Sequence, residues 1–182
     1  MRLAKVIAPW CGFLALALLG PGSVSAEDAA GLPGGATSLR ETHGDWVVSC
    51  SVQTVDDRTG KACALSQELT DTKSGQRVLA LELRPAGTSV DGTLVLPFGL
   101  TLANGVTLQI DDGQAGSPLA FRTCLPAGCI VPVAFDAKML AALRNGTTLK
   151  VRTTRDGGGD MQLAISLKGF AGALDRTAAL LK

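Results

Sequence analysis

The sequence predicts an all-β fold, an antiparallel β-sandwich or barrel-like single domain with one short helix, a C-terminal helix and two disulfides. Apolar and polar residues alternate over roughly eight short segments, which is the period of half-buried strands. Only two segments have a helical period, whereas a parallel sheet needs a crossover between successive strands, so antiparallel pairing is expected. Four cysteines follow an export signal, and exported cysteines usually form disulfides.

Residues 1–26 have the three parts of a secretory signal peptide. The start is positively charged and contains Arg2 and Lys5. An apolar run at residues 10–20 follows, which is too short to span a bilayer. A small-residue cleavage site then lies at Val24-Ser25-Ala26. Cleavage is expected after Ala26, and it also removes Cys11. The remaining chain suits one domain with a full core. We expect it in the periplasm, at the outer envelope or outside the cell.

The composition after cleavage argues against several classes of ligand. Removing Arg2 and Lys5 from the 17 basic residues leaves 15 against 16 acidic residues, so the net charge of −1 gives no attraction for nucleic acid or an anionic membrane. The remaining five aromatic residues include no tyrosine, which is too few for the stacking platforms of sugar or single-strand binders. No second long apolar run remains, so no transmembrane span is expected.

Residues 27–43 are expected to form a flexible leader, because they are rich in Gly, Ala, Ser and Thr and have no apolar period. From Asp45 the pattern changes to the alternation typical of strands. The β domain is therefore expected over residues 44–182.

The first strand pair is expected to contain the first disulfide. Cys50 and Cys63 each fall on the apolar face of an alternating segment, DWVVSCSV and ACALSQEL. If the hairpin is centred on Asp56-Asp57, in the middle of the polar connection, Cys50 lies opposite Cys63. Face and register agree, which favours this bridge over the other two connectivities. On the chain-entropy model, closing this loop of about 14 residues contributes roughly 3 kcal/mol.

Further alternating segments predict the other strands. They lie at residues 76–83, 93–99, 106–110, 120–124, 129–135, 147–154 and 160–169. The last two segments flank Asp156-Gly157-Gly158-Gly159 and are expected to form a second hairpin. Its inward face should hold Leu149, Val151, Met161, Leu163, Ile165 and Leu167.

Two segments have a helical pattern. Asp136 is expected to cap a helix over residues 137–145, with Phe135 packed on Leu140 and Gly146 at the end. The tail should form a second helix over residues 170–181, with one apolar face made of Phe170, Leu174, Ala178 and Leu181. This tail helix is expected to cover an open edge or end of the sheet.

The second cysteine pair, Cys124 and Cys129, can close a small ring across a turn that contains Pro126 and Gly128. A structural disulfide is favoured because the spacing differs from the C-x-x-C of thioredoxin-like enzymes and no βαβ pattern surrounds it. A redox-active pair is the alternative. A zinc site is disfavoured because only this pair has ligand spacing and an oxidising compartment opposes thiolate ligands.

No arrangement of residues indicates a catalytic, cofactor-binding or metal site. His43 is the single histidine and lies in the predicted leader, and the sequence has no G-x-S-x-G motif. Asp111-Asp112-Gly113 and residues 156–160 place carboxylates beside glycines but do not match a calcium loop, so turn formation is the favoured explanation. We therefore expect a protein that is not an enzyme.

Five short strings occur in an order that resembles the invasion-associated locus B family of exported proteins from Gram-negative, largely alphaproteobacterial, bacteria. The strings are Gly44-Asp45-Trp46, Pro97-Phe98-Gly99-Leu100, residues 105–111, Phe121-Arg122-Thr123-Cys124, and residues 166–170. The resemblance spans about residues 44–176. It implies a periplasmic or outer-envelope protein, associated in pathogenic members with entry into host cells, notably erythrocytes. It implies no catalytic residues.

Three hypotheses follow for the function. The first is a non-enzymatic interaction module that binds a protein partner in the envelope or on a host cell. The second is an envelope thiol-disulfide protein or redox sensor that uses Cys124 and Cys129. The third is a lipocalin-like module with a ligand pocket. The oligomeric state does not follow from the sequence.

Overall fold

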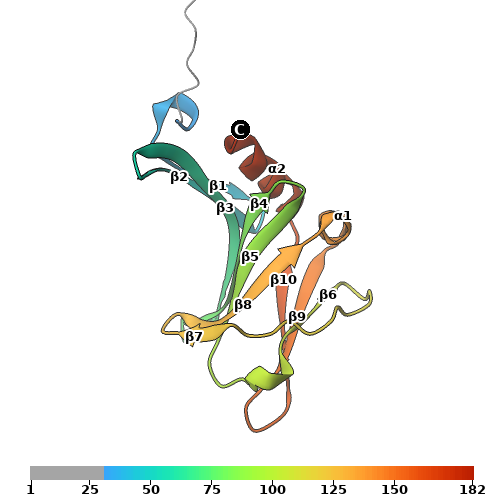
Figure 1. The fold of residues 1–182 in the computed structure, drawn as a ribbon. Helices are drawn as coiled ribbons and strands as arrows, with labels where there is room; N and C mark the ends of the chain where they lie inside the picture. The colour runs from blue at the N-terminus through green and yellow to red at the C-terminus, as the bar shows by residue number, and fades with distance from the viewer. Residues whose placement is uncertain (1–30) are drawn as a thin grey trace, which may run out of the picture.

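The computed structural model describes residues 31–182, which form two antiparallel β-sheets and two α-helices (Figure 1). The strands are β1 (Ser38–His43), β2 (Trp46–Val55), β3 (Arg58–Thr70), β4 (Arg77–Ala86), β5 (Ser89–Leu96), β6 (Thr107–Ile110), β7 (Thr123–Leu125), β8 (Gly128–Phe135), β9 (Thr148–Thr154) and β10 (Asp160–Ser166). The helices are α1 (Ala137–Asn145) and α2 (Phe170–Leu180), and short 3-10 turns occupy Pro33–Gly35 and Leu102–Asn104. The predicted all-β class, with one short and one C-terminal helix, is confirmed.

The larger sheet has the strand order β1-β2-β3-β4-β5-β8-β7, and the smaller sheet has the order β10-β9-β6. Strands β1 to β5 form a meander in which each strand pairs with the next. The chain then leaves the larger sheet after Leu96, contributes β6 to the smaller sheet and returns as β7 and β8. The two sheets therefore share the chain, as in a sandwich, and the core lies between them.

The inner faces of both sheets supply the core. Trp46, Leu65, Leu81 and Leu83 from the larger sheet and Leu149, Val151 and Ile165 from the smaller sheet are buried in one cluster. The predicted inward face of the β9–β10 hairpin is confirmed in its alternation, although Met161 and Leu163 remain half-buried near the free end. Each strand therefore has one apolar and one wetter face, as its sequence alternation predicts.

A buried polar clip joins the two sheets at the end of β10. The Gln67 side chain is 5% exposed, and its amide donates to Ser166 O at 2.9 Å while its oxygen accepts from Ser166 N at 2.9 Å. The Trp46 indole N–H also donates to Ser166 O, at 2.8 Å. These bonds satisfy backbone groups of an edge strand that would otherwise be buried without partners.

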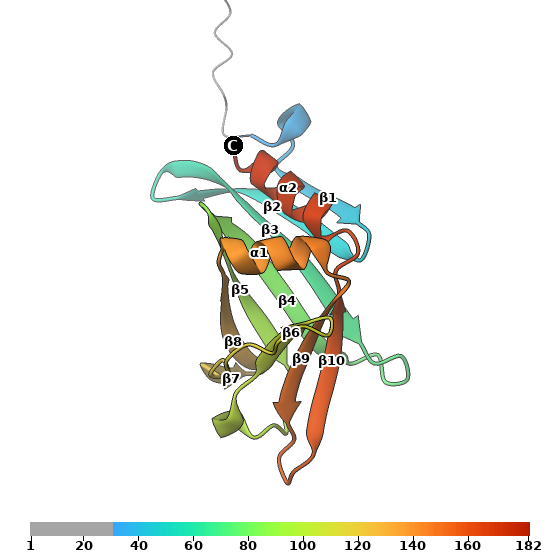
Figure 2. The ribbon, with the colours of Figure 1, turned by 90° about the vertical axis from the view of Figure 1, so that its right-hand side faces the viewer.

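Helix α2 covers the face of the larger sheet near β1, β2 and β3 (Figure 2). Phe170 packs edge-on against Trp46, with ring centroids 5.1 Å apart. The helix lies on the face of the larger sheet at the end that holds the edge strand β1, in agreement with the prediction that it covers an edge or end of the sheet. Its buried face is made of Phe170, Ala173, Leu174, Thr177 and Leu180, so Ala178 and Leu181 are only partly covered.

Strand β1 corrects the prediction of a flexible leader over residues 27–43. Residues 38–43 pair with β2 in register, from Ser38 opposite Ser51 to His43 opposite Trp46. The inward positions of β1 hold Leu39, Glu41 and His43, so the strand has no apolar alternation that would reveal it. The predicted signal peptide and its cleavage site lie outside the described residues.

Helix α1 forms over the predicted residues and begins as predicted, because Met139 N donates to the Asp136 carboxylate at 2.7 Å. Gly146 ends it, but for a reason that the sequence pattern does not show. Its φ of −80° is open to any residue, whereas a Cβ at this position would lie 2.6 Å from the Ile110 side chain. The glycine is required by close packing rather than by a left-handed cap.

Candidate functional site

The two disulfides form between the predicted cysteines, each across a pair of neighbouring strands. Cys50 on β2 lies directly opposite Cys63 on β3, with an S–S distance of 2.01 Å, and both residues are buried. The hairpin turns at Asp56 and Asp57, as the predicted register requires, and both residues have positive φ. This bridge is part of the core.

The second disulfide lies at the surface. Cys124 on β7 lies opposite Cys129 on β8, and the S–S distance is 2.00 Å. Cys129 is 2% exposed, whereas Cys124 is exposed on the short outermost strand. The disulfide therefore holds a three-residue edge strand against the sheet and has one side open to solvent.

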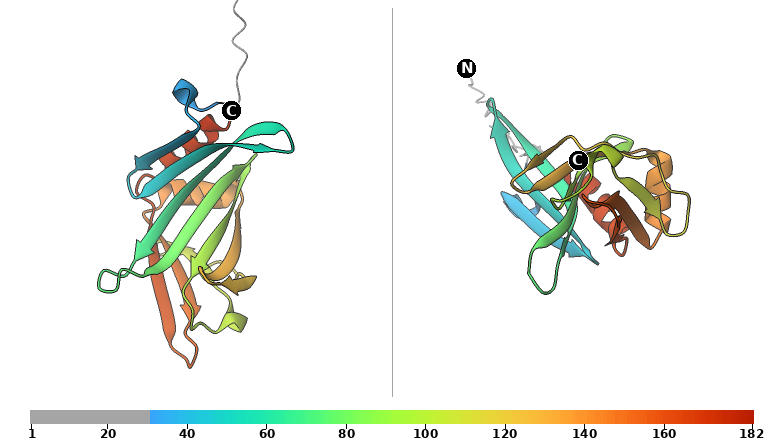
Figure 3. Two further views of the ribbon diagram at one scale, coloured as in Figure 1. Left: turned by 90° about the vertical axis from the view of Figure 1, so that its left-hand side faces the viewer. Right: turned by 90° about the horizontal axis from the view of Figure 1, so that it is seen from below.

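Three large apolar side chains are exposed on the β7–β8 hairpin and on the segment between β5 and β6. Leu125 is 50% exposed on the β7–β8 hairpin, and Phe98 and Leu102 are 60% and 44% exposed in the segment between β5 and β6. Figure 3 shows the hairpin and this segment at the same end of the molecule. We call Phe98, Leu102 and Leu125 the apolar tip. Large apolar residues exposed at one end of a molecule are candidates for an interaction surface.

A cleft of about 530 Å³ lies beside the apolar tip. Phe98 forms one wall, the Pro126-Ala127 turn forms another, and Arg77 lies between them. The Arg77 guanidinium donates to Ala127 O and lies 3.6 Å from the Glu68 carboxylate. The turn is therefore held from two directions, by the disulfide behind it and by Arg77 beside it, so the cleft is formed before any partner arrives.

Gly128 explains why the hairpin can lie so close to β5. Its φ is +130°, and a Cβ at this position would lie 2.5 Å from Leu96 O. A side chain at residue 128 would therefore force β8 away from β5 and widen the cleft. In the sequence, this glycine is visible only as part of a turn.

A second hollow, of about 680 Å³, lies between α1 and the loop at residues 111–119. We call it the α1 groove. Its walls come from β6, this loop, the end of β8 and α1, and they are lined by Leu108, Ile110, Gly113, Gln114, Gly116, Ser117, Leu119, Ala134, Phe135, Asp136, Met139 and Ala142. The groove shares no lining residue with the cleft beside the apolar tip.

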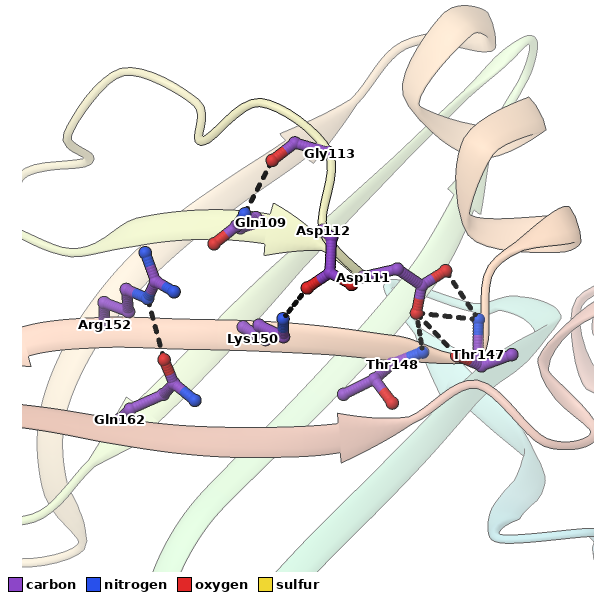
Figure 4. Close-up of polar contacts among 9 residues, drawn as sticks. All are labelled: Gln109, Asp111, Asp112, Gly113, Thr147, Thr148, Lys150, Arg152 and Gln162. Carbon is purple, nitrogen blue, oxygen red and sulfur yellow. Dashed lines mark hydrogen bonds and ion pairs between the residues drawn. The ribbon is translucent and has the colours of Figure 1, made fainter.

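Polar contacts hold the start of the loop at residues 111–119, as Figure 4 shows. The Asp111 carboxylate accepts hydrogen bonds from the Thr147 hydroxyl at 2.6 Å, from Thr147 N, and from Thr148 N at 2.9 Å. These donors, with the Thr147 hydroxyl first, hold the pKa of Asp111 below its usual range. Gln109 donates to Gly113 O at 2.6 Å, and Lys150 pairs with Asp112 at 2.8 Å.

The acidic residues of this loop thus contact residues 147–150 through Asp111 and Asp112. Asp111 has a φ of +47°, a conformation that its three hydrogen bonds stabilise. No group of three or more His, Cys, Asp or Glu side chains suited to a metal ion occurs among residues 31–182.

His43 lies in β1 and not in a flexible leader. Its Nε2 is 3.3 Å from Glu41, and Arg176 on α2 donates to both oxygens of Glu41 at 2.8 Å. The hydrogen bond from Arg176 is the main reason why the pKa of Glu41 falls to about 2. This group links the edge strand to the C-terminal helix and contains no nucleophile.

A known protein family matches most of the chain. The sequence profile described as Invasion associated locus B (IalB) protein matches residues 46–178. The chain belongs to the invasion associated locus B family. This match confirms the resemblance carried by the five short strings, four of which lie wholly within residues 46–178.

Relatives and a solved structure agree with this family. An invasion protein B homologue of Brucella abortus is 54% identical over 156 residues, which cover 85% of this chain and 87% of the relative. Invasion protein B of Bartonella bacilliformis is 36% identical over 156 residues, with 84% and 82% covered. A crystal structure of invasion associated protein B from Bartonella henselae matches with a TM-score of 0.71 and 36% identity, covering 78% of this chain and 96% of that one. The apolar tip and the α1 groove both lie within residues 46–178, the part of the chain that matches the family.

Both features were missed in the sequence because they depend on tertiary contacts. The alternation predicts Phe98 at the end of a strand, where Pro97 and Gly99 stop it. A large aromatic residue between two strand-breaking residues indicates an exposed loop position, so the sequence does contain a signal for Phe98. The α1 groove offered no such signal, since its walls come from four separate segments.

No helix within residues 31–182 is both long enough and apolar enough to cross a membrane.

Proposed function

We propose that this protein is an exported cell-envelope module that acts by binding a protein partner through the apolar tip, without catalysing a reaction. The single observation that carries this proposal is the exposure of Phe98, Leu102 and Leu125 in two segments at one end of the molecule, where Phe98 also lines a cleft. Exposed apolar side chains near a concave site suit a protein side chain or loop as the occupant.

Export and a role in invasion belong to the same proposal. The signal-peptide pattern of residues 1–26 and two disulfides within the domain support an oxidising compartment outside the cytoplasm. Relatives whose names refer to invasion support a partner on a host cell. The alternative is a partner in the bacterial envelope. N-terminal sequencing of the protein from cells tests the export step, with Glu27 as the expected first residue.

The test of the docking surface uses a photo-crosslinking amino acid in intact cells. The amino acid replaces Phe98 in one variant and Val55 in another, because Val55 is also a large exposed apolar residue (64%) but lies at the β2–β3 turn. We expect one enriched protein adduct from position 98 and none from position 55. The absence of an enriched adduct at position 98, or the same adducts from both positions, would contradict the proposal.

Substitution of the same residues gives the energetic test. Phe98→Ser should weaken capture of the crosslinked partner by roughly tenfold or more, because burying a phenyl ring contributes about 1.5–3 kcal/mol. Val55→Ser should leave capture unchanged. Both substitutions are at exposed positions, so the domain is expected to keep its fold.

The exposure of Cys124 supports a second candidate function, thiol–disulfide exchange. A partner thiolate could reach Cys124 Sγ, form a mixed disulfide with it and release Cys129 as a thiolate. A second thiol of the partner would then break the mixed disulfide, so that the partner is oxidised and the hairpin is reduced.

Alkylation of free thiols at lysis, followed by mapping of unreduced peptides, separates the two candidates. Full oxidation of both cysteine pairs in envelope extracts would support the binding module. A substantial reduced or mixed-disulfide fraction at Cys124 and Cys129, with Cys50 and Cys63 fully oxidised, would support exchange.

A further inference from the structure

The α1 groove opens at the side of the sandwich where β6, an edge strand of the smaller sheet, faces α1 and the end of β8 (Figure 2). At the opposite edge of the smaller sheet, Gln67 and Trp46 tie Ser166 of β10 to the larger sheet. On the β6 side, a hollow of about 680 Å³ leads from the surface to the buried side chains of Leu108 and Phe135. This size is within the range of sites that bind small molecules.

The walls of the groove are set in place without a ligand. Asp111 ties the start of the loop to the segment that follows α1, and Gln109 holds Gly113 over β6 (Figure 4). Further along, Gly116 N donates to Leu108 O at 2.8 Å, and Val106 and Leu119 exchange two backbone hydrogen bonds. On the other side, Asp136 caps α1. A preformed hollow binds a ligand with a small ordering cost.

The lining selects an aliphatic chain. Leu108, Ile110, Leu119 and Met139 supply branched and flexible apolar surface, and the glycines and alanines between them leave room. Phe135 is the only aromatic residue among those that line the groove, so a flat ring system would have no pair of stacking partners. The thioether of Met139 adapts well to a flexible chain.

The charge at the groove selects the head group. Asp136 is the only charged residue among those that line it, and it is exposed. One of its carboxylate oxygens accepts from Met139 N, and the other has no partner within the part of the chain that the structure describes. Gln114 and Ser117 add neutral polar groups. No lysine or arginine lines the groove, so a carboxylate or phosphate head would meet like charge and no cation.

We propose that the α1 groove binds the single aliphatic chain of a monomeric amphiphile whose head group is neutral or cationic. The chain lies against Leu108, Leu119 and Met139, and the head group lies at the rim beside Asp136. This site is independent of the apolar tip, and its failure would leave the proposed docking surface untouched.

Methionine methyl resonances provide a direct test. Met139 lines the groove and Met161 lies on β10 outside it, and no other methionine occurs in residues 27–182. The protein labelled with [¹³C-methyl]methionine is titrated with dodecyltrimethylammonium, monododecanoylglycerol and dodecanoate, each below its micelle concentration. We expect the Met139 resonance to shift and saturate with the first two probes, while the Met161 resonance stays in place.

Two pairs of measurements assign the binding to the groove. Ala142→Leu places a larger side chain in the groove and should weaken binding of dodecyltrimethylammonium by roughly tenfold. Ala141→Leu makes the same change at an exposed position of α1 that does not line the groove, and it should leave binding unchanged. Asp136→Asn keeps a good helix cap but removes the charge. It should reduce the preference for dodecyltrimethylammonium over dodecanoate by roughly three- to fivefold, as expected for an exposed ion pair.

Three results would overturn the proposal. One is the absence of a saturable Met139 shift with every probe. Another is equal weakening by Ala141→Leu and Ala142→Leu, which would place the probe elsewhere. The third is tighter binding of dodecanoate than of dodecyltrimethylammonium. Pelleting of the protein with phosphatidylcholine vesicles, without a Met139 shift from the soluble probes, would likewise show a membrane surface contact and exclude the monomeric amphiphile.

Discussion

At the scale of single residues, Gly44 and Gly169 show how two segments far apart in the sequence come into contact. Asp45 N donates to Lys168 O at 3.0 Å, so the β1–β2 turn lies against the junction of β10 and α2. A Cβ on Gly44 would lie 2.5 Å from Lys168 O, and one on Gly169 would lie 2.0 Å from His43 O. Both glycines also have positive φ, so this contact is open only to glycine at both positions.

Gly169→Ala is therefore expected to destabilise the protein strongly. Backbone strain at a positive φ costs about 1–3 kcal/mol, and the clash with backbone atoms adds to it, so the free energy of unfolding should fall by more than about 3 kcal/mol. Gly158→Ala is the control, because Gly158 has a φ of +101° and open space around it. It should show the strain without the clash. Urea denaturation compares the two, and equal losses would contradict the packing argument.

The two disulfides should differ in their contribution to stability. The sequence separations are 13 and 5 residues, so the chain-entropy model gives about 3 kcal/mol for Cys50–Cys63 and about 2 kcal/mol for Cys124–Cys129. Removal of the first pair by alanine also leaves space in the core. The free energy of unfolding of the two double-alanine variants, from urea denaturation, should preserve this order. The reverse order would show that the surface hairpin contributes more than its loop length indicates.

At the scale of elements, α2 depends on one aromatic contact with the larger sheet. Phe170 begins the helix and packs against Trp46, and both rings are buried. Phe170→Ala should lower the free energy of unfolding by about 3–5 kcal/mol, whereas Phe98→Ala at the apolar tip should change it by less than about 0.5 kcal/mol. The same substitution thus separates a core role from a surface role. A large loss of stability with Phe98→Ala would show that the apolar tip is structural.

The sequence predicted the elements whose own pattern shows their environment. The β2–β3 hairpin, the register of Cys50 and Cys63, the β9–β10 hairpin and α1 all follow from alternation, turn residues or a helix cap. In each of these the decisive contacts lie between residues near in the chain. Local chemistry was therefore sufficient.

The elements that were missed or misplaced depend on distant partners. Strand β1 has Glu41 on its inner face, where its main partner is Arg176, 135 residues away. Thr177 lies on the buried face of α2, where its hydroxyl donates to Ala173 O at 2.7 Å. The buried face therefore includes a polar residue that an apolar pattern does not reveal. The candidate sites depend on tertiary contacts even more, since the apolar tip joins two loops and the α1 groove joins four segments.

At the scale of the whole molecule, the two ends of the sandwich contain different features. One end holds β1, α2 and the ion pair between Glu41 and Arg176. The other end holds the apolar tip and the β7–β8 hairpin (Figure 3). A change that loosens α2 should therefore lower stability without altering the apolar tip directly, which allows the two to be measured separately.

The link between β1 and α2 should make the stability of the molecule depend on pH in acid. The pKa of Glu41 is about 2 in the folded protein, compared with 4.5 as its ordinary value, chiefly because Arg176 donates to its carboxylate. The unfolded chain therefore binds a proton more readily than the folded one. The stabilisation is fully present above pH 4.5 and is lost as the pH falls through about 2. Urea midpoints of the wild type and Glu41→Gln, measured from pH 7 to pH 2.5, should differ by a constant amount above about pH 5 and converge below it. A difference that stays constant down to pH 2.5 would mean that this ion pair does not couple the edge strand to the C-terminal helix.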